Sequence, residues 1–158
     1  MAIDAVRTYF AKFGREDDIM EVQESSATVD LAAYVLGVES GRIAKSISLK
    51  TAQSAMLIIT SGDVLLDNRK FKDAFHMKPR MCSAEEVLEF TGHAVGGVCP
   101  FALKMTLDVY LDESLKRFGT VFPACGSSNS MIELTLPDLE KFSLSKGYVN
   151  VCKYKSTD

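Results

Sequence analysis

The chain has 158 residues, of which 47% are hydrophobic and 25% are charged, a composition typical of one soluble globular domain with a sizeable core. No apolar run approaches the ~20 residues that a membrane span needs, and the charged residues within the first segment argue against a signal peptide. The formal net charge of −3 argues against a general nucleic-acid binder. Residues 42–80 nevertheless carry eight basic and three acidic side chains. This block could face a polyanion, although charge alone favours the simpler interpretation of a solvated face.

The four cysteines, Cys82, Cys99, Cys125 and Cys152, are widely scattered and include no C-x-x-C pair. This spacing indicates neither a zinc knuckle nor a dithiol redox motif. We therefore expect reduced thiols in a cytoplasmic protein, with no metal site and no cofactor.

The first third of the chain predicts two helices and a short strand. Apolar residues spaced three or four apart predict a helix over residues 3–13, which Gly14 can end. Residues 19–22 are a strand candidate. Thr28 can cap a second helix that runs to Leu36.

The middle of the chain predicts neighbouring strands followed by two helices. Residues 44–51 and 54–60 are rich in Ile, Leu and Thr, as strands are. Asp67 can cap the helix that follows. The S-x-x-E pattern starting at Ser83 is a capping box for a further helix, which ends near Gly92.

The last third predicts three strands over residues 108–111, 120–125 and 131–136, a helix that begins at Pro137, and a closing strand over residues 148–154. Strands and helices therefore mix without a regular βαβ alternation. The order predicts an α+β fold with a mixed, curved sheet, in a single domain that spans residues 1–158.

Lys45 is the first candidate functional residue. A strand period of two places it in one row with Ile43, Ile47 and Leu49, all of which are apolar. A lysine in such a row must bind an anion, reach solvent or lose its charge. One interpretation is a lysine that extends to water, and the other is a cation that lines a pocket for a phosphate or carboxylate.

The segment H-A-V-G-G-V-C-P-F-A-L, residues 93–103, is the second candidate. Gly96 and Gly97 permit positive φ angles and a close approach of backbone to a ligand, so that their N–H groups could bind an oxyanion. Pro100 favours an extended Cys99 and stiffens the loop. The simpler interpretation is a structural turn.

Cys99 could act as a nucleophile only with a thiolate and a nearby base. The chain offers just His76 and His93 as histidine bases. A small, buried and inert cysteine is the favoured interpretation.

A third candidate is the polar turn G-S-S-N-S at residues 126–130. It is either a turn rich in turn-forming residues or a lip of hydroxyl and amide groups that binds a ligand. A Ser-His-Asp site is poorly supported, because no nucleophile elbow is present.

Three segments in register resemble the YbaK/prolyl-tRNA editing domain family. They are T-V-D-L-A-A-Y-V-L-G-V-E-S-G-R-I-A-K-S-I-S-L-K, S-A-E-E-V-L-E-F-T-G-H-A-V-G-G-V-C-P-F-A-L and V-F-P-A-C-G-S-S-N-S-M-I-E-L-T-L-P-D-L-E-K-F. The resemblance implies a mixed sheet that closes into a partial barrel, with helices outside it. It also implies hydrolysis in trans of the ester bond of a misacylated tRNA, most often proline tRNA, with the acceptor end as the bound part and transient contact with a tRNA synthetase.

The resemblance also implies roles for particular residues. Lys45 matches the family's essential lysine, and Gly96 matches the loop glycine whose backbone faces the aminoacyl carbonyl. Both are therefore expected to be catalytic. The residues expected to bind substrate are Gly97, Cys99, Pro100, Gly126, Ser127, Ser128 and Asn129. A placed water and a ribose hydroxyl of the substrate would complete the chemistry without a metal.

The chain departs from the family at two places that border the expected pocket. Cys99 stands where relatives often have Ser or Thr before the proline, and G-S-S-N-S stands where well-known members have a basic turn. The main alternative is a module of the same fold that binds tRNA or a nucleotide without hydrolysis. A cysteine-dependent hydrolase is a third hypothesis.

Overall fold

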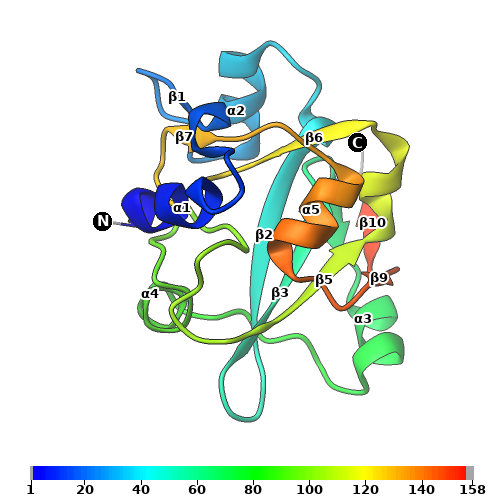
Figure 1. Ribbon diagram of the computed structural model, residues 1–158. Coiled ribbons are helices and arrows are strands. Elements are labelled where there is room, and N and C mark those ends of the chain that lie inside the picture. The colour runs from blue at the N-terminus through cyan, green and yellow to red at the C-terminus, as the bar shows by residue number, and fades with distance from the viewer. Residues whose placement is uncertain (1, 156–158) are drawn as a thin grey trace.

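Six strands form one curved sheet at the centre of the computed structural model, which describes residues 2–155 (Figure 1). Their order is β8-β6-β2-β3-β5-β9, and the sheet curls into a half-barrel. The strands are β2 (Ile43–Lys50), β3 (Ala55–Ser61), β5 (Asp108–Asp112), β6 (Thr120–Pro123), β8 (Leu134–Thr135) and β9 (Tyr148–Val149).

The pairing within this sheet is mixed. β2 and β3 form the long antiparallel centre, with Ala44 opposite Ser61 and Lys50 opposite Ala55. β3 pairs in parallel with β5, β5 with β9, and β2 with β6, whereas β6 and β8 are antiparallel. The predicted α+β fold with a mixed, partly closed sheet and flanking helices is therefore confirmed.

Two short ribbons accompany the main sheet. In one, β1 (Met20–Glu21) pairs with β7 (Ser130–Met131), and in the other β4 (Val64–Leu66) pairs with β10 (Cys152–Tyr154). Both pairs are antiparallel. The second ribbon ties the last described strand to the connection that follows β3.

Three helices begin at the capping residues that the sequence indicated, whereas α1 ends at Ala11, before Gly14, and α5 begins at Leu136, one residue before Pro137. Thr28, Asp67 and Ser83 each accept hydrogen bonds from backbone N–H groups at a helix start, and Ser83 with Glu86 forms the full capping box. The α-helices are α1 (Ala2–Ala11), α2 (Val29–Leu36), α3 (Asn68–Phe75), α4 (Ala84–Thr91) and α5 (Leu136–Ser143), and the 3-10 helices are η1 (Glu16–Asp18), η2 (Ser40–Arg42) and η3 (Glu113–Arg117). Within residues 2–155, no helix is long and apolar enough to cross a membrane.

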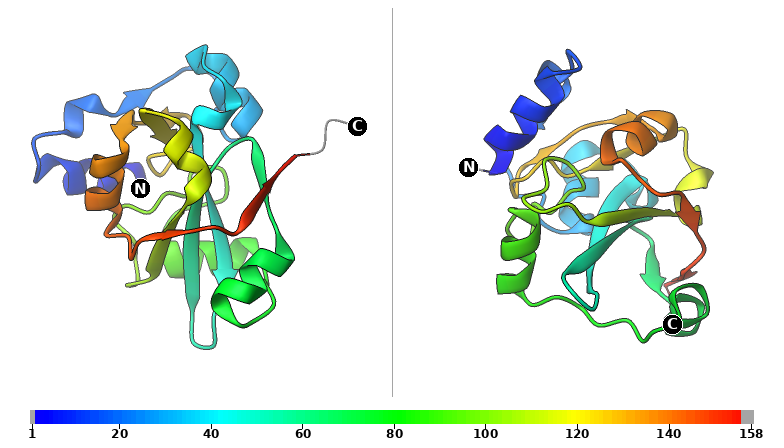
Figure 2. Two further views of the ribbon diagram at one scale, coloured as in Figure 1. Left: turned by 90° about the vertical axis from the view of Figure 1, so that its right-hand side faces the viewer. Right: turned by 60° about the horizontal axis from the view of Figure 1, so that its bottom comes forward.

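Helices α1 and α5 cover one side of the sheet and α3 the other (Figure 2). On the first side, the ring of Phe10 meets the rings of Phe101 and Phe142 edge to face, with centroids 4.9 and 5.2 Å away. On the other side, Phe71 of α3 packs with Leu49 of β2. Each of these buried side chains stabilises the fold by roughly 1.5–3 kcal/mol.

The predicted strands near the C-terminus are divided in the structure. Met131 pairs with Met20 of β1, whereas Leu134 pairs with Val121 of β6, so residues 131–136 form parts of two strands. The predicted strand over residues 148–154 is likewise split between β9 and β10. In both cases the chain changes partner midway, a tertiary event that local pattern does not encode.

Candidate functional site

A pocket of about 340 Å³ opens between α2, β2 and the loops that follow α4 and β6. This size lies at the small end of the range of ligand pockets in proteins, roughly 300–1,000 Å³. The lining consists of residues 26–29, Ala32, Leu36, residues 43–46, Ser48, Met81, Cys82, Val87, Val95, Gly96, Val98, Phe122, Ala124, Ser130 and Met131.

The pocket lies at a gap in the edge of β2. On this edge β6 pairs only with Ile43 and Ala44. The next contacts come from residues 80–82, where the N–H of Cys82 donates to the Ser48 carbonyl at 3.1 Å. Peptide groups of alternate strand residues point to the same edge, so the peptide group of Ser46 faces the gap. A ligand can therefore approach strand backbone there.

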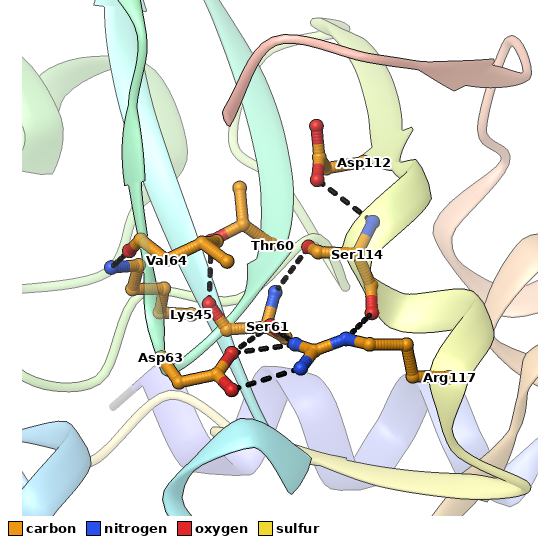
Figure 3. A network of polar contacts seen from close by, with 8 residues as sticks. All are labelled: Lys45, Thr60, Ser61, Asp63, Val64, Asp112, Ser114 and Arg117. Atoms are coloured by element: carbon orange, nitrogen blue, oxygen red, sulfur yellow. Dashed lines mark hydrogen bonds and ion pairs between the residues drawn. The ribbon is translucent and has the colours of Figure 1, made fainter. Parts of the chain in front are cut away.

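Lys45 comes from the same strand and lies half-buried in the lining. Its ammonium donates a hydrogen bond to the carbonyl of Val64, at the start of β4 (Figure 3). Burial lowers the pKa of Lys45, and the charge of Lys155 lowers it further. An ammonium has three donors, so the bond to Val64 leaves two protons for a bound anion or carbonyl.

The carbonyl that Lys45 contacts is held by the turn between β3 and β4. The guanidinium of Arg117 donates to both carboxylate oxygens of Asp63 at 3.0 and 2.6 Å, and to the Ser61 hydroxyl at 2.6 Å (Figure 3). This pairing lowers the pKa of Asp63 to about 2. The position of the Lys45 partner is thus fixed by a bidentate ion pair.

Gly96 lies at a tight turn on the pocket wall. The N–H of Gly97 donates to the Ala94 carbonyl at 3.0 Å, and Gly96 has a φ of 97°. A four-residue turn with positive φ only at its third position is type II, which favours glycine there. The N–H of Gly96 belongs to the central peptide of this turn and does not form the hydrogen bond that closes the turn, which runs from Gly97 to Ala94. Gly96 and Lys45, the two predicted catalytic residues, thus line one pocket.

Gly97 packs on the polar turn at residues 126–130 rather than on the pocket. Its carbonyl accepts from the N–H of Gly126 at 3.0 Å, and an added Cβ would lie 2.7 Å from the N atom of Ser127. Only a residue without a Cβ permits this backbone contact. The two loops expected to flank the substrate are therefore joined directly to each other.

The polar side chains of the 126–130 turn hold the turn itself. The hydroxyl of Ser127 lies 2.6 Å from that of Ser130, and Asn129 donates from Nδ2 to the Val22 carbonyl at 2.8 Å. The carbonyl of Ser128 accepts from the N–H of Ser26 at 2.6 Å. Within the described residues, only Ser130 of this turn lines the pocket. Gly126 and residues 127–129 are absent from the lining that the described residues form.

Cys99 and Pro100 are buried beneath the loop and are absent from the lining that the described residues form. The Sγ of Cys99 lies 3.4 Å from Nε2 of His93, but that nitrogen is 2.8 Å from the Phe101 carbonyl. It must carry a proton to bond a carbonyl, and so cannot accept one from the thiol. Burial raises the pKa of Cys99 to about 12. The pair is a packed thiol and a neutral imidazole rather than a nucleophile and a base.

Most of the lining residues were not predicted from the sequence, and two of them carry hydroxyl groups on β2. Ser46 and Ser48 lie on β2, one on each side of Ile47, and their hydroxyl oxygens are buried without a partner in the part of the chain that the structure describes. The available signal was the alternation of serine with apolar residues in a central strand. Within residues 2–155, no three potential metal-ligating side chains of His, Cys, Asp or Glu lie together.

Known proteins are similar to this chain in sequence. The chain is 53% identical over 154 residues to the uncharacterized protein YwhH of Bacillus subtilis (strain 168), with 97% of this chain and 98% of YwhH covered. A proline--tRNA ligase of Bacillus licheniformis is 30% identical over 108 residues, which are 65% of this chain and 19% of the ligase.

Solved structures agree with these relatives. A crystal structure described as a candidate trans-editing enzyme for prolyl tRNA synthetase superposes with a TM-score of 0.87 at 28% identity, covering 96% of this chain and 97% of that one. The hypothetical protein APE2540 gives a TM-score of 0.82 at 26% identity, covering 94% and 99%. The profile of the aminoacyl-tRNA editing domain matches residues 23–142. The chain therefore belongs to the aminoacyl-tRNA editing domain family.

Proposed function

We propose that this protein hydrolyses the ester bond that joins an amino acid to the terminal ribose of a mischarged tRNA, with proline tRNA as the first candidate. The observation that carries the proposal is the meeting of Lys45 and Gly96 on one small pocket at the open edge of β2. Family membership and the likeness to a candidate trans-editing enzyme support it. The acceptor end of the tRNA is the part that would enter.

In this reaction a water molecule attacks the ester carbonyl and the carbonyl oxygen gains negative charge. The N–H of Gly96 in the type II turn is a fixed donor for that oxyanion, of the kind that stabilises such transition states in other hydrolases. Collapse of the intermediate breaks the bond to the ribose oxygen, which takes up the proton that the water gave up. The products are the free amino acid and an uncharged tRNA.

The proposed role of Lys45 is to position the substrate by charge. With one ammonium proton on Val64, the other two can bind the terminal phosphate or the ester region. Its partial burial strengthens such a contact, because less water competes for the charge. No side chain near the ester would have to act as the nucleophile, which agrees with the buried, protonated state of Cys99.

The proposal is tested with a panel of mischarged proline tRNAs that carry Ala, Cys, Ser or Thr. We expect the wild-type protein to release at least one amino acid well above the spontaneous rate. In Gly96→Ala the new Cβ would lie 3.2 Å from that of Ala27 and would strain a φ of 97°. We expect a loss of about tenfold or more.

The matched control is Gly14→Ala, because Gly14 also has positive φ but nothing lies within 4 Å of an added Cβ. It should cleave at the wild-type rate. If the wild type releases no amino acid but binds the uncharged acceptor stem tightly, the binding-module alternative holds and the hydrolase proposal fails.

A further inference from the structure

The hydroxyls of Ser46 and Ser48 form an unsatisfied polar patch in the pocket. Successive side chains of a strand alternate between faces, so Ser46 and Ser48 share the face that also carries Ala44. Ser48 is 5% exposed. Neither hydroxyl oxygen has a hydrogen-bond partner within the described residues. Both groups could form hydrogen bonds and form none with the protein.

A buried hydroxyl without a partner costs folding free energy, whereas alanine at the same position would not. The other hydroxyl groups of the lining, those of Ser26, Thr28 and Ser130, all form hydrogen bonds within the protein. Lys45 bonds the Val64 carbonyl, and the Ser130 hydroxyl bonds that of Ser127. The Ser46 and Ser48 hydroxyls are thus left for a ligand.

The walls beside this patch are small and apolar. Val87 and Val98 line the pocket next to residues 81 and 82, and Ala44 continues the row of β2. With a volume of about 340 Å³, the pocket has room for a small amino acid beside part of the terminal ribose, but little for an aromatic side chain. The Ser46 peptide at the open edge offers an acceptor for the α-amino group that every amino acid carries, so it cannot discriminate among them.

We propose that Ser46 and Ser48 select aminoacyl groups with a side-chain hydroxyl, so that seryl and threonyl esters are cleaved in preference to alanyl and valyl esters. This inference rests on the proposed function and adds the substrate class. A substrate hydroxyl can donate to one serine and accept from the other, which satisfies both. An alanyl group would leave both hydroxyls buried and unpaired, and sites built to bond a hydroxyl discriminate strongly against its absence.

The test measures kcat/KM on proline tRNA charged with Ser, Ala, Thr or Val. Threonine and valine have nearly the same shape, so their comparison isolates the hydroxyl. For the wild type we expect ratios of Ser to Ala and of Thr to Val of about tenfold or more, the effect of one hydrogen bond to a buried partner. In Ser46→Ala and Ser48→Ala both ratios should fall toward one, through slower cleavage of the hydroxyl-bearing esters.

Ser54→Ala is the matched control, because Ser54 lies in the turn between β2 and β3 and outside the pocket lining. It should leave both ratios unchanged. Ser48→Ala removes an unpaired buried hydroxyl, so its melting temperature should equal or exceed that of the wild type. A variant that is folded, cleaves seryl esters as fast as the wild type and keeps the ratios would overturn the inference.

The two proposals fail in different ways. If no ester is cleaved by any form of the protein, the hydrolase proposal fails and the inference falls with it. If esters are cleaved but the wild type prefers alanyl to seryl groups, or the serine variants keep the wild-type preference, only the inference fails.

Discussion

Lys45 occupies one position of β2 that contacts the fold and, in the proposed function, would also bind the substrate. Ile43 and Leu49, whose side chains lie on the same face of β2 as that of Lys45, are buried. The ammonium of Lys45 nevertheless contacts a backbone carbonyl, that of Val64. A carboxylate partner would neutralise the charge of the ammonium. A carbonyl partner offsets part of the cost of burying that charge and leaves it in place. The ammonium therefore keeps its charge at the pocket, as the proposed role in substrate binding requires.

Cys99 leads to a prediction at the same scale. Its thiol is fully buried with a pKa raised to about 12, and His93 cannot accept its proton. Cys99→Ala should therefore keep deacylation within about threefold of the wild type, while losing about 1–2 kcal/mol of stability from the small cavity. Rates on the best substrate and urea unfolding check both parts. A loss of activity in a folded variant would instead support the cysteine-dependent hydrolase.

His93 leads to a pH prediction. Burial lowers its pKa below the ordinary 6.5, so the unfolded chain binds a proton more readily than the folded one. The stability from its neutral form is complete above about pH 6.5 and is lost as the pH falls from there toward the folded pKa. Urea unfolding between pH 5 and 7.5 should show this decline in the wild type and a flatter profile in His93→Gln.

The control for that profile is His76→Asn, since His76 is exposed and in the left-handed region at the end of α3, where Asn is tolerated. It should keep the wild-type slope. An equal slope in His93→Gln and wild type would show that another group causes the decline.

Lys45 and Gly96 could be identified from the sequence because each is unusual in its local context. Lys45 is a cation in a row of apolar strand residues, and Gly96 belongs to a glycine pair shortly before a proline. Ser46 and Ser48 are harder to identify from the sequence, since serine in a strand is often exposed or hydrogen-bonded to a neighbouring residue. Whether such a hydroxyl has a partner depends on what packs against that face of the sheet, which the sequence alone does not state.

At the scale of elements, the contact between the 94–98 loop and the 126–130 turn defines the pocket wall. Gly97→Ala would place a Cβ 2.7 Å from backbone that cannot rotate away. We expect a loss of about 1–3 kcal/mol of unfolding free energy and slower deacylation, because the wall must shift. Gly119→Ala, with nothing within 4 Å, is the control and should be nearly neutral. Equal stability of the two variants would contradict the close packing.

The turn between β3 and β4 leads to a further prediction. Arg117 depresses the pKa of Asp63 to about 2, so the ion pair stabilises the fold above the ordinary pKa of 3.8 and is lost as the pH falls through about 2. Because both side chains are one-third exposed, solvent screening reduces the effect to about 1 kcal/mol. Asp63→Asn should show that deficit at pH 7 and a shrinking deficit below pH 4 in urea unfolding.

A deficit in Asp63→Asn that is independent of pH would contradict the ion-pair origin. If the turn positions Lys45 as proposed, this variant should also raise KM for the mischarged tRNA more than it lowers kcat. Its melting profile separates that effect from simple unfolding.

Helix boundaries were predictable because caps are local. Thr28, Asp67 and Ser83 each act within one turn of their own position. Strand β4 was not predicted, since three residues carry no period and its partner β10 lies at the far end of the chain. Short strands form where a distant partner offers an edge, which propensity does not report.

On the scale of the whole molecule, the candidate site follows from how the half-barrel closes. β6 stops at the start of β2, and the 80–82 segment joins only near its end, so the sheet opens between them. The walls of that opening come from segments between residues 26 and 131. Sequence motifs indicated that three of these segments belong to the candidate site, and their resemblance indicated the family. The size and polarity of the pocket could be determined only from the folded structure.

The most direct test of the account is the rate at which the protein releases an amino acid from the mischarged proline tRNA that it cleaves fastest, measured for wild type, Lys45→Ala and Lys50→Ala. Lys50 is the matched lysine of β2, paired with Glu86 at 3.1 Å and outside the pocket lining. We predict a loss of about 100-fold or more in Lys45→Ala with an unchanged melting temperature, and no significant loss in Lys50→Ala. Release by Lys45→Ala at the wild-type rate would contradict the account.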